Sequence, residues 1–289
     1  MIKAKTFLAI AQRELWEHPN LIWRIPLGLG LLFVFLAVCS VVFGFNYLSD
    51  INAEVTVDVV GGSDLMTVGD GPGQALSTFF CFAFFLLSQL IALNYLLGTL
   101  YQERKDRSIL FWKSLPVSDL DVVLSKLIVG VVLVPMVYLL LAWMTSLLVA
   151  LLLWLGLSSV MSDGMSFSEL FFAAVYGGFE WFVIVCKQMI WGLPFFLWVL
   201  LVSGVVSSQP ILWVLGIPLV VMIIENIAFP QSVISDWFWA HATPWPLGGE
   251  AQSWEPLSGA SLVESVVIVL TSLILFVIAV VSRRHFNEI

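Results

Sequence analysis

The amino-acid sequence predicts an all-α membrane protein with six transmembrane helices. Of its 289 residues, 60% are hydrophobic and only 11% are charged, and the mean hydropathy is +1.02. Soluble domains are about 45–50% apolar and about 25% charged. A helix needs about 20 apolar residues to cross a bilayer, and the sequence contains several such stretches. The spans and their loops occupy most of this length, so a fused catalytic domain is not expected.

Residues 1–20 are predicted to form an amphipathic helix before the first span. Phe7, Ala11 and Leu15 recur at helical spacing, charged side chains occupy other positions, and Pro19 separates the helix from the membrane. A helix of this kind lies in the plane of the lipid headgroups. It is either an anchor that only fixes orientation or an element that also transmits force, and the pattern is compatible with both.

Six apolar stretches within residues 21–289 are predicted to cross the membrane. They are 25–45, 75–101, 127–157, 189–206, 211–228 and 265–282, joined by an inner loop at 102–126 and by outer loops at 46–74, 158–188 and 229–264. The fourth and fifth come from one apolar stretch that is too long for a single crossing. Pro210 divides that stretch, because the residue before a proline disfavours helical geometry.

Residues 168–186 are the ambiguous segment of this topology. The segment is apolar apart from Glu180 and Glu169, and Ser166 is a suitable cap for a helix that starts here. It can be an interfacial helix, a re-entrant helix or part of a long fourth helix. A seventh crossing would place the basic C-terminal end of the chain outside, so we favour an interfacial or partly re-entrant outer helix.

The charges define the two sides of the predicted protein. With a cytoplasmic N-terminus, every lysine and arginine except Lys187 lies inside or at the inner boundary, in agreement with the positive-inside rule. Most acidic residues fall in the outer loops, so the net charge of −8 belongs mainly to the outer side. Both termini are expected in the cytoplasm. The expected surroundings are a lipid bilayer, and nucleic acid is not an expected partner.

The sequence contains no motif for metal, nucleotide or hydrolytic chemistry. Cys39, Cys81 and Cys186 lie in or beside apolar stretches without CxxC spacing, so neither a disulfide framework nor a metal site is expected. The phosphate loop GxxxxGK[ST], the metal motif HExxH and the nucleophile motif GxSxG do not occur. We therefore expect no enzyme and no cofactor on this chain. If ATP drives the protein, a separate chain must bind it.

The inner loop carries the most informative pattern. Charges of both signs precede a short apolar face that stops at a proline, and a serine then caps the next helix. A short capped helix with an exposed tryptophan suits docking into a groove of a soluble partner. The alternative is a solvated loop whose basic residues only signal topology, and for the charges alone this alternative is favoured. The residues expected to contact a partner are Glu103, Arg104, Asp106, Arg107, Ile109, Trp112, Leu115, Pro116, Ser118 and Asp119.

A charged side chain also lies near the outer end of the fifth span. Glu225, beside Asn226, would cost about 2.5–3.5 kcal/mol at a helix centre and should face a cavity, water or a partner. One interpretation is a polar point on a pathway or at an outer gate. The other is an interfacial position from which Glu225 reaches water, and Pro230 favours it slightly because it ends the helix soon afterwards.

The pattern of the inner loop resembles the cytoplasmic loop of ABC-2 type transporter permeases. The matching parts are the charged cluster 103–107, the apolar turn 109–112 and the sequence of residues 115–118, which runs into a helix with Lys126 at the membrane. Residues 13–19 are similar to the start of such permeases, where an elbow helix precedes the first span. The specific motifs cover only these two regions, and the remaining similarity is one of topology.

The resemblance implies the membrane subunit of an ATP-binding cassette exporter with type V architecture. Two six-helix subunits, the second being another copy or a homologous permease, would each rest on a nucleotide-binding subunit that holds ATP and magnesium. The inner loop would contain the coupling helix that contacts this ATPase, and the outer loop 229–264 would contain short re-entrant helices that close the pathway. For its tryptophans taken singly, an interfacial aromatic belt is the stronger interpretation. The membrane would be the bacterial cytoplasmic (inner) membrane.

Few charged residues fall within the spans, which favours a lipophilic or amphipathic cargo such as a lipid, peptide or drug. An ion-gradient-driven secondary transporter is an alternative, but it predicts inverted repeats and paired carboxylates near the membrane midplane. A membrane assembly factor without transport is a further alternative.

Overall fold

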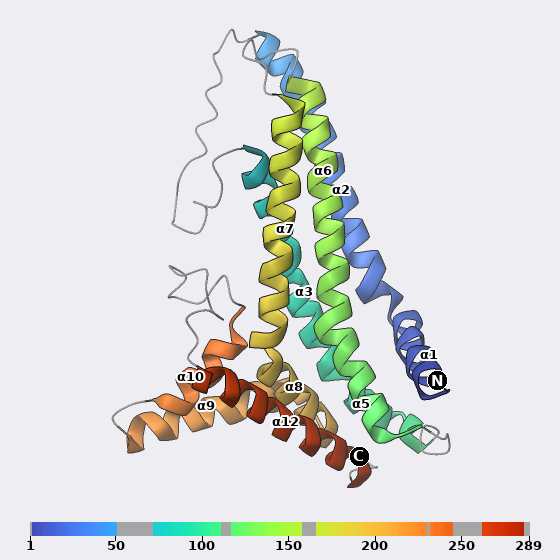
Figure 1. Cartoon of the computed structure of the whole chain (residues 1–289), viewed down its shortest axis with the longest axis vertical. Coiled ribbons are helices and arrows are strands. Elements are labelled where there is room, and N and C mark those ends of the chain that lie inside the picture. The colour runs from blue at the N-terminus through green and yellow to red at the C-terminus, as the bar shows by residue number, and fades with distance from the viewer. Residues whose placement is uncertain are drawn as a thin grey trace. The chain divides into compact units, whose positions relative to one another are not determined.

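Every regular element in the described part of the chain is a helix, which confirms the predicted all-α class. The computed structural model describes residues 2–50, 72–110, 117–157, 166–229, 232–244 and 262–285. The elements, shown in Figure 1, are α1 (Ile2–Glu17), the π-helical turn η1 (Asn20–Arg24), α2 (Ile25–Asp50), α3 (Pro72–Lys105), α5 (Asp119–Ile128), the π-helical turn η2 (Val129–Leu133), α6 (Val134–Leu157), α7 (Phe167–Trp191), α8 (Leu193–Val205), α9 (Pro210–Ala228), α10 (Val233–Ala242) and α12 (Leu262–His285).

Among the residues that the structure describes, six helical segments are long and apolar enough to cross a membrane. They are Asn20–Phe43, Gly73–Lys105, Asp119–Gly156, Phe167–Trp191, Pro210–Ala228 and Val263–His285. Large apolar side chains such as Leu31, Phe35 and Ile227 are exposed on these helices. Such surfaces are costly in water and are expected against lipid. The chain is therefore a multi-pass membrane protein with six candidate spans.

The fourth candidate span of the structure has different bounds from the span expected at 189–206. Residues 168–186, expected as an interfacial or re-entrant helix, belong to α7, which has 25 residues. The expected span 189–206 is divided at Gly192, and Pro194 in the first turn of α8 prevents a continuous helix because its ring fixes the backbone and supplies no N–H donor. The 13 residues of α8 extend only about 20 Å, short of a hydrocarbon core of about 30 Å.

The predicted break at Pro210 is present. Helix α8 ends at Val205 and α9 begins at Pro210, where a proline in the first turn loses no helical hydrogen bond. Gln209 directly before it has a φ of 44°, in the left-handed region, which turns the chain sharply between the two helices.

The chain forms two compact units. Unit 1 contains Met1–Pro19, Ser88–Pro135 and Cys186–Ile289, and unit 2 contains Asn20–Leu87 and Met136–Val185. Within unit 1, α12 packs along α8, α10 packs on α9, and α1 packs on α5. These packings bring the ends of several helices of unit 1 together.

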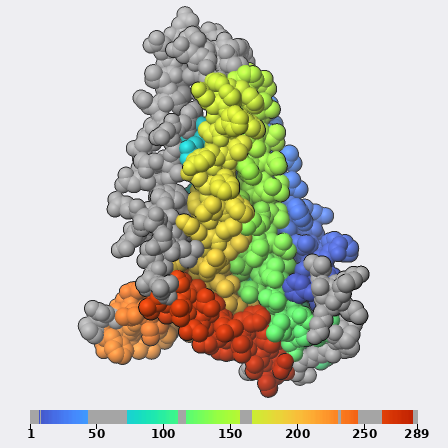
Figure 2. Space-filling view, in the orientation of Figure 1, coloured from blue at the N-terminus to red at the C-terminus, as the bar shows by residue number. Residues whose placement is uncertain are grey.

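In unit 2, small residues allow close helix contacts. A Cβ at Gly178 of α7 would lie 2.3 Å from Nε1 of Trp143 in α6, and a Cβ at Gly156 of α6 would lie 2.5 Å from Cγ1 of Val41 in α2. Figure 2 shows α6 and α7 in contact along their length. Close approach at glycine is a common way to pack helices in lipid, where dispersion contacts replace the hydrophobic effect.

Candidate functional site

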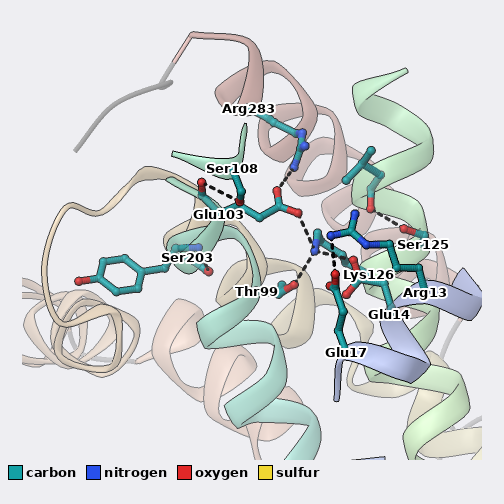
Figure 3. A network of polar contacts seen from close by, with 12 residues as sticks. Arg13, Glu14, Glu17, Thr99, Glu103, Ser108, Ser125, Lys126, Ser203 and Arg283 are labelled. Carbon is teal, nitrogen blue, oxygen red and sulfur yellow. Dashed lines mark hydrogen bonds and ion pairs between the residues drawn. The ribbon is translucent and has the colours of Figure 1, made fainter. Parts of the chain in front are cut away.

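A buried group of charged side chains joins four helices of unit 1. It consists of Glu14 from α1, Glu103 from α3, Asp119 and Lys126 from α5, and Arg283 from α12, and we call it the ionic cluster. Figure 3 shows how Glu103 lies between Arg283 on one side and Lys126 on the other. Each carboxylate faces a cation, so the charges are compensated where water is largely excluded.

Lys126 is at the centre of the cluster. Its Nζ lies 2.8 Å from Oε1 of Glu14 and 3.0 Å from Oε1 of Glu103, and it donates to Oγ1 of Thr99 at 2.8 Å. Its side chain is only 3% exposed. Two of the three ammonium donors thus have hydrogen-bond acceptors in Glu14 and Thr99, and Glu103 adds a second ion pair. Lys126 therefore binds α1 and α3 to α5.

Glu14 enters the cluster from α1. Tyr95 donates from its hydroxyl to Oε2 of Glu14 at 2.8 Å, and the ring of His18 packs edge-on against the ring of Tyr95. Burial by itself raises the pKa of Glu14, but the charge of Lys126 and hydrogen bonds from Lys126 and Tyr95 together hold this pKa below its ordinary value. Glu14 is therefore ionised and bound.

Glu14 was not expected as a site residue from the sequence. The sequence predicted an apolar face of α1 built on Phe7, Ala11 and Leu15, whereas the most buried side chains on the described part of the helix are Ile10 and Glu14. The four-residue spacing of Ile10 and Glu14 was the available signal, because such residues share one helix face. From the sequence alone, a glutamate on a helix is expected to face solvent unless a partner cation is known. The partner of Glu14 is Lys126, which is too distant in the sequence to be recognised.

Arg283 connects the two ends of the inner loop. Its Nη1 donates to Oε2 of Glu103 at 2.6 Å, and its Nε donates to Oδ1 of Asp119 at 3.1 Å. Arg283 was predicted only as a topology signal at the inner boundary. The structure instead gives it two carboxylate partners, one before the loop and one after it.

Arg104 holds the C-terminal end of α8. Its guanidinium donates to the backbone carbonyls of Ser203, Val205 and Val206 at 3.0, 3.2 and 2.5 Å. The last carbonyls of a helix lack intrahelical partners and carry partial negative charge, so a cation is stabilising there. The hydroxyl of Ser203 also accepts from the backbone N–H of Tyr101, which fixes α8 against α3.

The other residues predicted for the inner loop have different surroundings. Asp106 and Arg107 are exposed, whereas Ile109 is turned inward and fully buried. Ser118 caps α5 by accepting from the N–H of Asp121 at 3.1 Å, as its sequence position predicts. Trp112, Leu115 and Pro116 fall within residues 111–116, which lie outside the described residues.

Two residues expected at a partner surface are instead buried within the chain. Glu103 and Arg104 have little exposed surface, because Glu103 binds Lys126 and Arg283 while Arg104 binds the end of α8. Their role in the structure is to hold the base of the loop 106–118.

Glu225 caps another helix rather than facing open space. Its carboxylate accepts from the backbone N–H groups of Ile234 and Ser235 at 2.7 and 2.8 Å and from the hydroxyl of Ser235 at 2.7 Å. These donors belong to the first turn of α10, where a carboxylate satisfies free N–H groups and the positive end of the helix dipole. Asn226 is exposed and donates to the carbonyl of Met222 in its own helix.

An aromatic stack holds the other end of α10. The ring of His241 lies between Trp191, at 4.3 Å between centroids, and Trp237, at 4.2 Å. Nε1 of Trp191 donates to the carbonyl of Ala240 at 3.0 Å. Burial lowers the pKa of His241, while its contact with the carbonyl of Trp237 and the charge of Glu264 act in the opposite direction. Helix α10 is thus fixed at both ends.

No protein-family model matches the chain, and no curated protein matches it significantly. Within the described ranges, no group of three or more His, Cys, Asp or Glu side chains is placed to hold a metal ion. The ionic cluster and the loop that it holds are therefore the features from which function is argued.

Proposed function

We propose that the chain is the transmembrane subunit of an ATP-driven exporter of the ABC-2 type. The observation that carries the proposal is the attachment of the loop 106–118, which begins and ends at the ionic cluster. A partner that presses on this loop acts at once on α1, α3, α5 and α12. A shared base of this kind lets a soluble motor that docks on the loop move several helices together.

The charges of unit 1 support the cytoplasmic placement of this loop. Basic residues assigned to the inside from the sequence gather at the ends of α3, α5 and α12 that meet in the cluster. They are Arg104, Lys105, Arg107, Lys126, Arg283 and Arg284. Clustered lysine and arginine residues next to spans mark the cytoplasmic side, so the proposed location is a bacterial cytoplasmic membrane with both termini inside.

In the proposed complex, a separate nucleotide-binding subunit binds ATP and magnesium and docks on the inner loop. A second copy of the chain, or a homologous permease, completes the pathway. Closure of the ATPase pair displaces the loop and shifts the helices between two arrangements of similar free energy. In this chain, buried Ile109 and the cap formed by Ser118 keep the loop ends from yielding independently of the helices.

The proposed cargo is lipophilic or amphipathic, such as a lipid, a peptide or a drug. Glu180, a carboxylate in the middle of α7, accepts a hydrogen bond from Gln74 of α3 at 2.8 Å. Glu225 is bound to α10 in a similar way. Carboxylates engaged by neighbouring helices stabilise the protein and offer little to a small free cation, which favours an apolar cargo over an ion.

Co-purification with an ATPase encoded beside this chain tests the proposal. The double variant Trp112→Ala with Leu115→Ala is expected to reduce association at least about tenfold, because apolar anchors dominate such interfaces. Trp16→Ala is the matched control, since Trp16 is an exposed tryptophan on α1 outside the loop. Undiminished association and ATPase stimulation in the double variant would refute the docking role. Uptake driven by a proton gradient without ATP would support a secondary transporter instead.

A further inference from the structure

A single guanidinium group closes the base of the loop 106–118. Arg283 of α12 donates to Glu103, near the end of α3, and to Asp119, the first residue of α5. The loop leaves α3 just after the first of these carboxylates and enters α5 at the second. Its two ends are therefore joined through one side chain of a third helix.

The surroundings of Arg283 make this connection difficult to replace. The side chain of Arg283 is 2% exposed, whereas that of neighbouring Arg284, which approaches Asp119 at 3.7 Å, is 65% exposed. A buried charge that loses its partner is strongly destabilising, while an exposed pair contributes little. The guanidinium also presents its donors in a fixed planar fork, which a lysine ammonium lacks.

The same end of α3 is attached to a second helix. Glu103 reaches α12 through Arg283, and adjacent Arg104 reaches the last carbonyls of α8. Adjacent side chains point about 100° apart around a helix, so they contact different neighbours. Because α12 also packs along α8, the two attachments hold a pair of helices that are in contact with each other.

We infer that Arg283 is a positioning residue that passes a displacement of the loop 106–118 to α12. The ends of the loop cannot separate or tilt without either moving Arg283 or breaking two charge-assisted hydrogen bonds, one buried and one partly buried. The source of the displacement, an ATPase subunit on the loop, rests on the proposed function. The closure of the loop base by Arg283 does not depend on it.

Hydrogen–deuterium exchange on the full chain in lipid nanodiscs tests the closure. Arg283→Gln is expected to speed exchange about tenfold in residues 106–110 and in the first turn of α5, because the loop ends lose their common partner. Arg283→Lys, which keeps the positive charge, is expected to show a smaller increase. Arg284→Gln is the matched control and should exchange like the wild type. Equal exchange in all four proteins would overturn the inference.

The second experiment adds the candidate ATPase subunit with ATP and vanadate to the same proteins. In the wild type, nucleotide should change exchange both in residues 106–110 and in residues 277–285 of α12. In Arg283→Lys, the change in the loop should remain while the change in α12 falls at least about twofold. An undiminished α12 response in that variant would overturn the inference alone. No response in either segment of the wild type would overturn the proposed function, and the first experiment would still decide the closure.

Discussion

Glu14 and Glu17 lie one turn apart on α1 but have very different surroundings. The side chain of Glu14 is 2% exposed and binds Lys126, whereas that of Glu17 is 41% exposed and pairs with Arg13. Glu14→Gln leaves the buried Lys126 without one of its two carboxylates, and we expect a loss of about 3 kcal/mol in the free energy of unfolding. Glu17→Gln should cost less than about 1 kcal/mol.

Thermal or denaturant unfolding of the two variants in the same detergent checks this difference. Tyr95→Phe is a useful third variant, because it removes only the hydroxyl that donates to Glu14. It should fall between the other two, with a loss of about 1–2 kcal/mol for a hydrogen bond to a charged group. Equal effects of Glu14→Gln and Glu17→Gln would contradict the burial of the cluster.

His241 makes stability depend on pH. Because burial lowers its pKa in the folded protein, the unfolded chain binds the proton more tightly, and stability rises with pH. The contribution is complete above the ordinary pKa of 6.5 and is lost as the pH falls from there toward the lower folded value. His241→Phe keeps a ring between Trp191 and Trp237 but cannot titrate. Melting temperatures between about pH 5 and pH 8 should therefore fall less steeply in this variant.

The wild type and His241→Phe share the other two histidines, His18 and His285, so the difference between their pH profiles reports on position 241. Glu264 favours the protonated ring of His241 through its charge. Glu264→Gln should therefore steepen the fall in stability at low pH. Parallel profiles for the wild type and His241→Phe would show that His241 titrates equally in the folded and unfolded states.

At the scale of helices, α7 depends on close contacts at glycine. A Cβ at Gly178 would lie 2.3 Å from Nε1 of Trp143, and this indole is a rigid group in α6. We expect Gly178→Ala to destabilise the protein by about 1–3 kcal/mol, because the helices must separate to accommodate the methyl group. Gly98→Ala in α3 is the matched control, since nothing lies within 4 Å of its Cβ. The control should be neutral or gain up to about 1 kcal/mol from helix propensity.

Unfolding in detergent separates these expectations, and a stabilised Gly178→Ala would show that α7 and α6 are not in close contact. Residues 168–186 were expected to form an interfacial or partly re-entrant helix, because a seventh crossing would place the basic C-terminal end of the chain outside. In the structure, the absence of a side chain at Gly178 leaves room for the indole of Trp143, and Glu180 accepts a hydrogen bond from Gln74 of α3. These contacts join residues that are distant in the sequence, and no local pattern contains them.

The ionic cluster shows the same limit of prediction. The loop ends were found from the sequence, since Ser118 and Asp119 carry a local capping pattern and the proline breaks follow from backbone geometry. Glu14 and Arg283 were missed as its partners, because they lie near opposite ends of the chain. The positive-inside rule alone accounts for a basic residue at position 283. The sequence therefore provided no reason to expect an ion-pair partner for Arg283. The apolar spans were predictable because hydropathy is a property of each segment alone.

For the whole molecule, the crossing by α7 changes the distribution of charge. The predicted topology left Lys187 outside as an exception, because the fourth span was placed after it. If α7 is the fourth crossing, Lys187, near the C-terminal end of that helix, is expected on the side of the inner loop. In this topology all 12 lysine and arginine residues of the sequence would be expected on one side or at its boundary. The positive-inside rule therefore favours the division of helices that the structure shows.

Cysteine labelling distinguishes the two topologies. In a chain whose three native cysteines are replaced by alanine, Lys187→Cys should react with a membrane-impermeant maleimide only from the side that labels Asp106→Cys. Ser166→Cys, just before α7, should react from the opposite side, because a helix of 25 residues spans about 37 Å and crosses the hydrocarbon core. Labelling of Lys187→Cys from the same side as Ser166→Cys would contradict a crossing by α7 and support the span expected at 189–206. A chain with six crossings in which α7 is the fourth must then return through α9 and α12, which brings Arg283 back to the side of the loop that it holds.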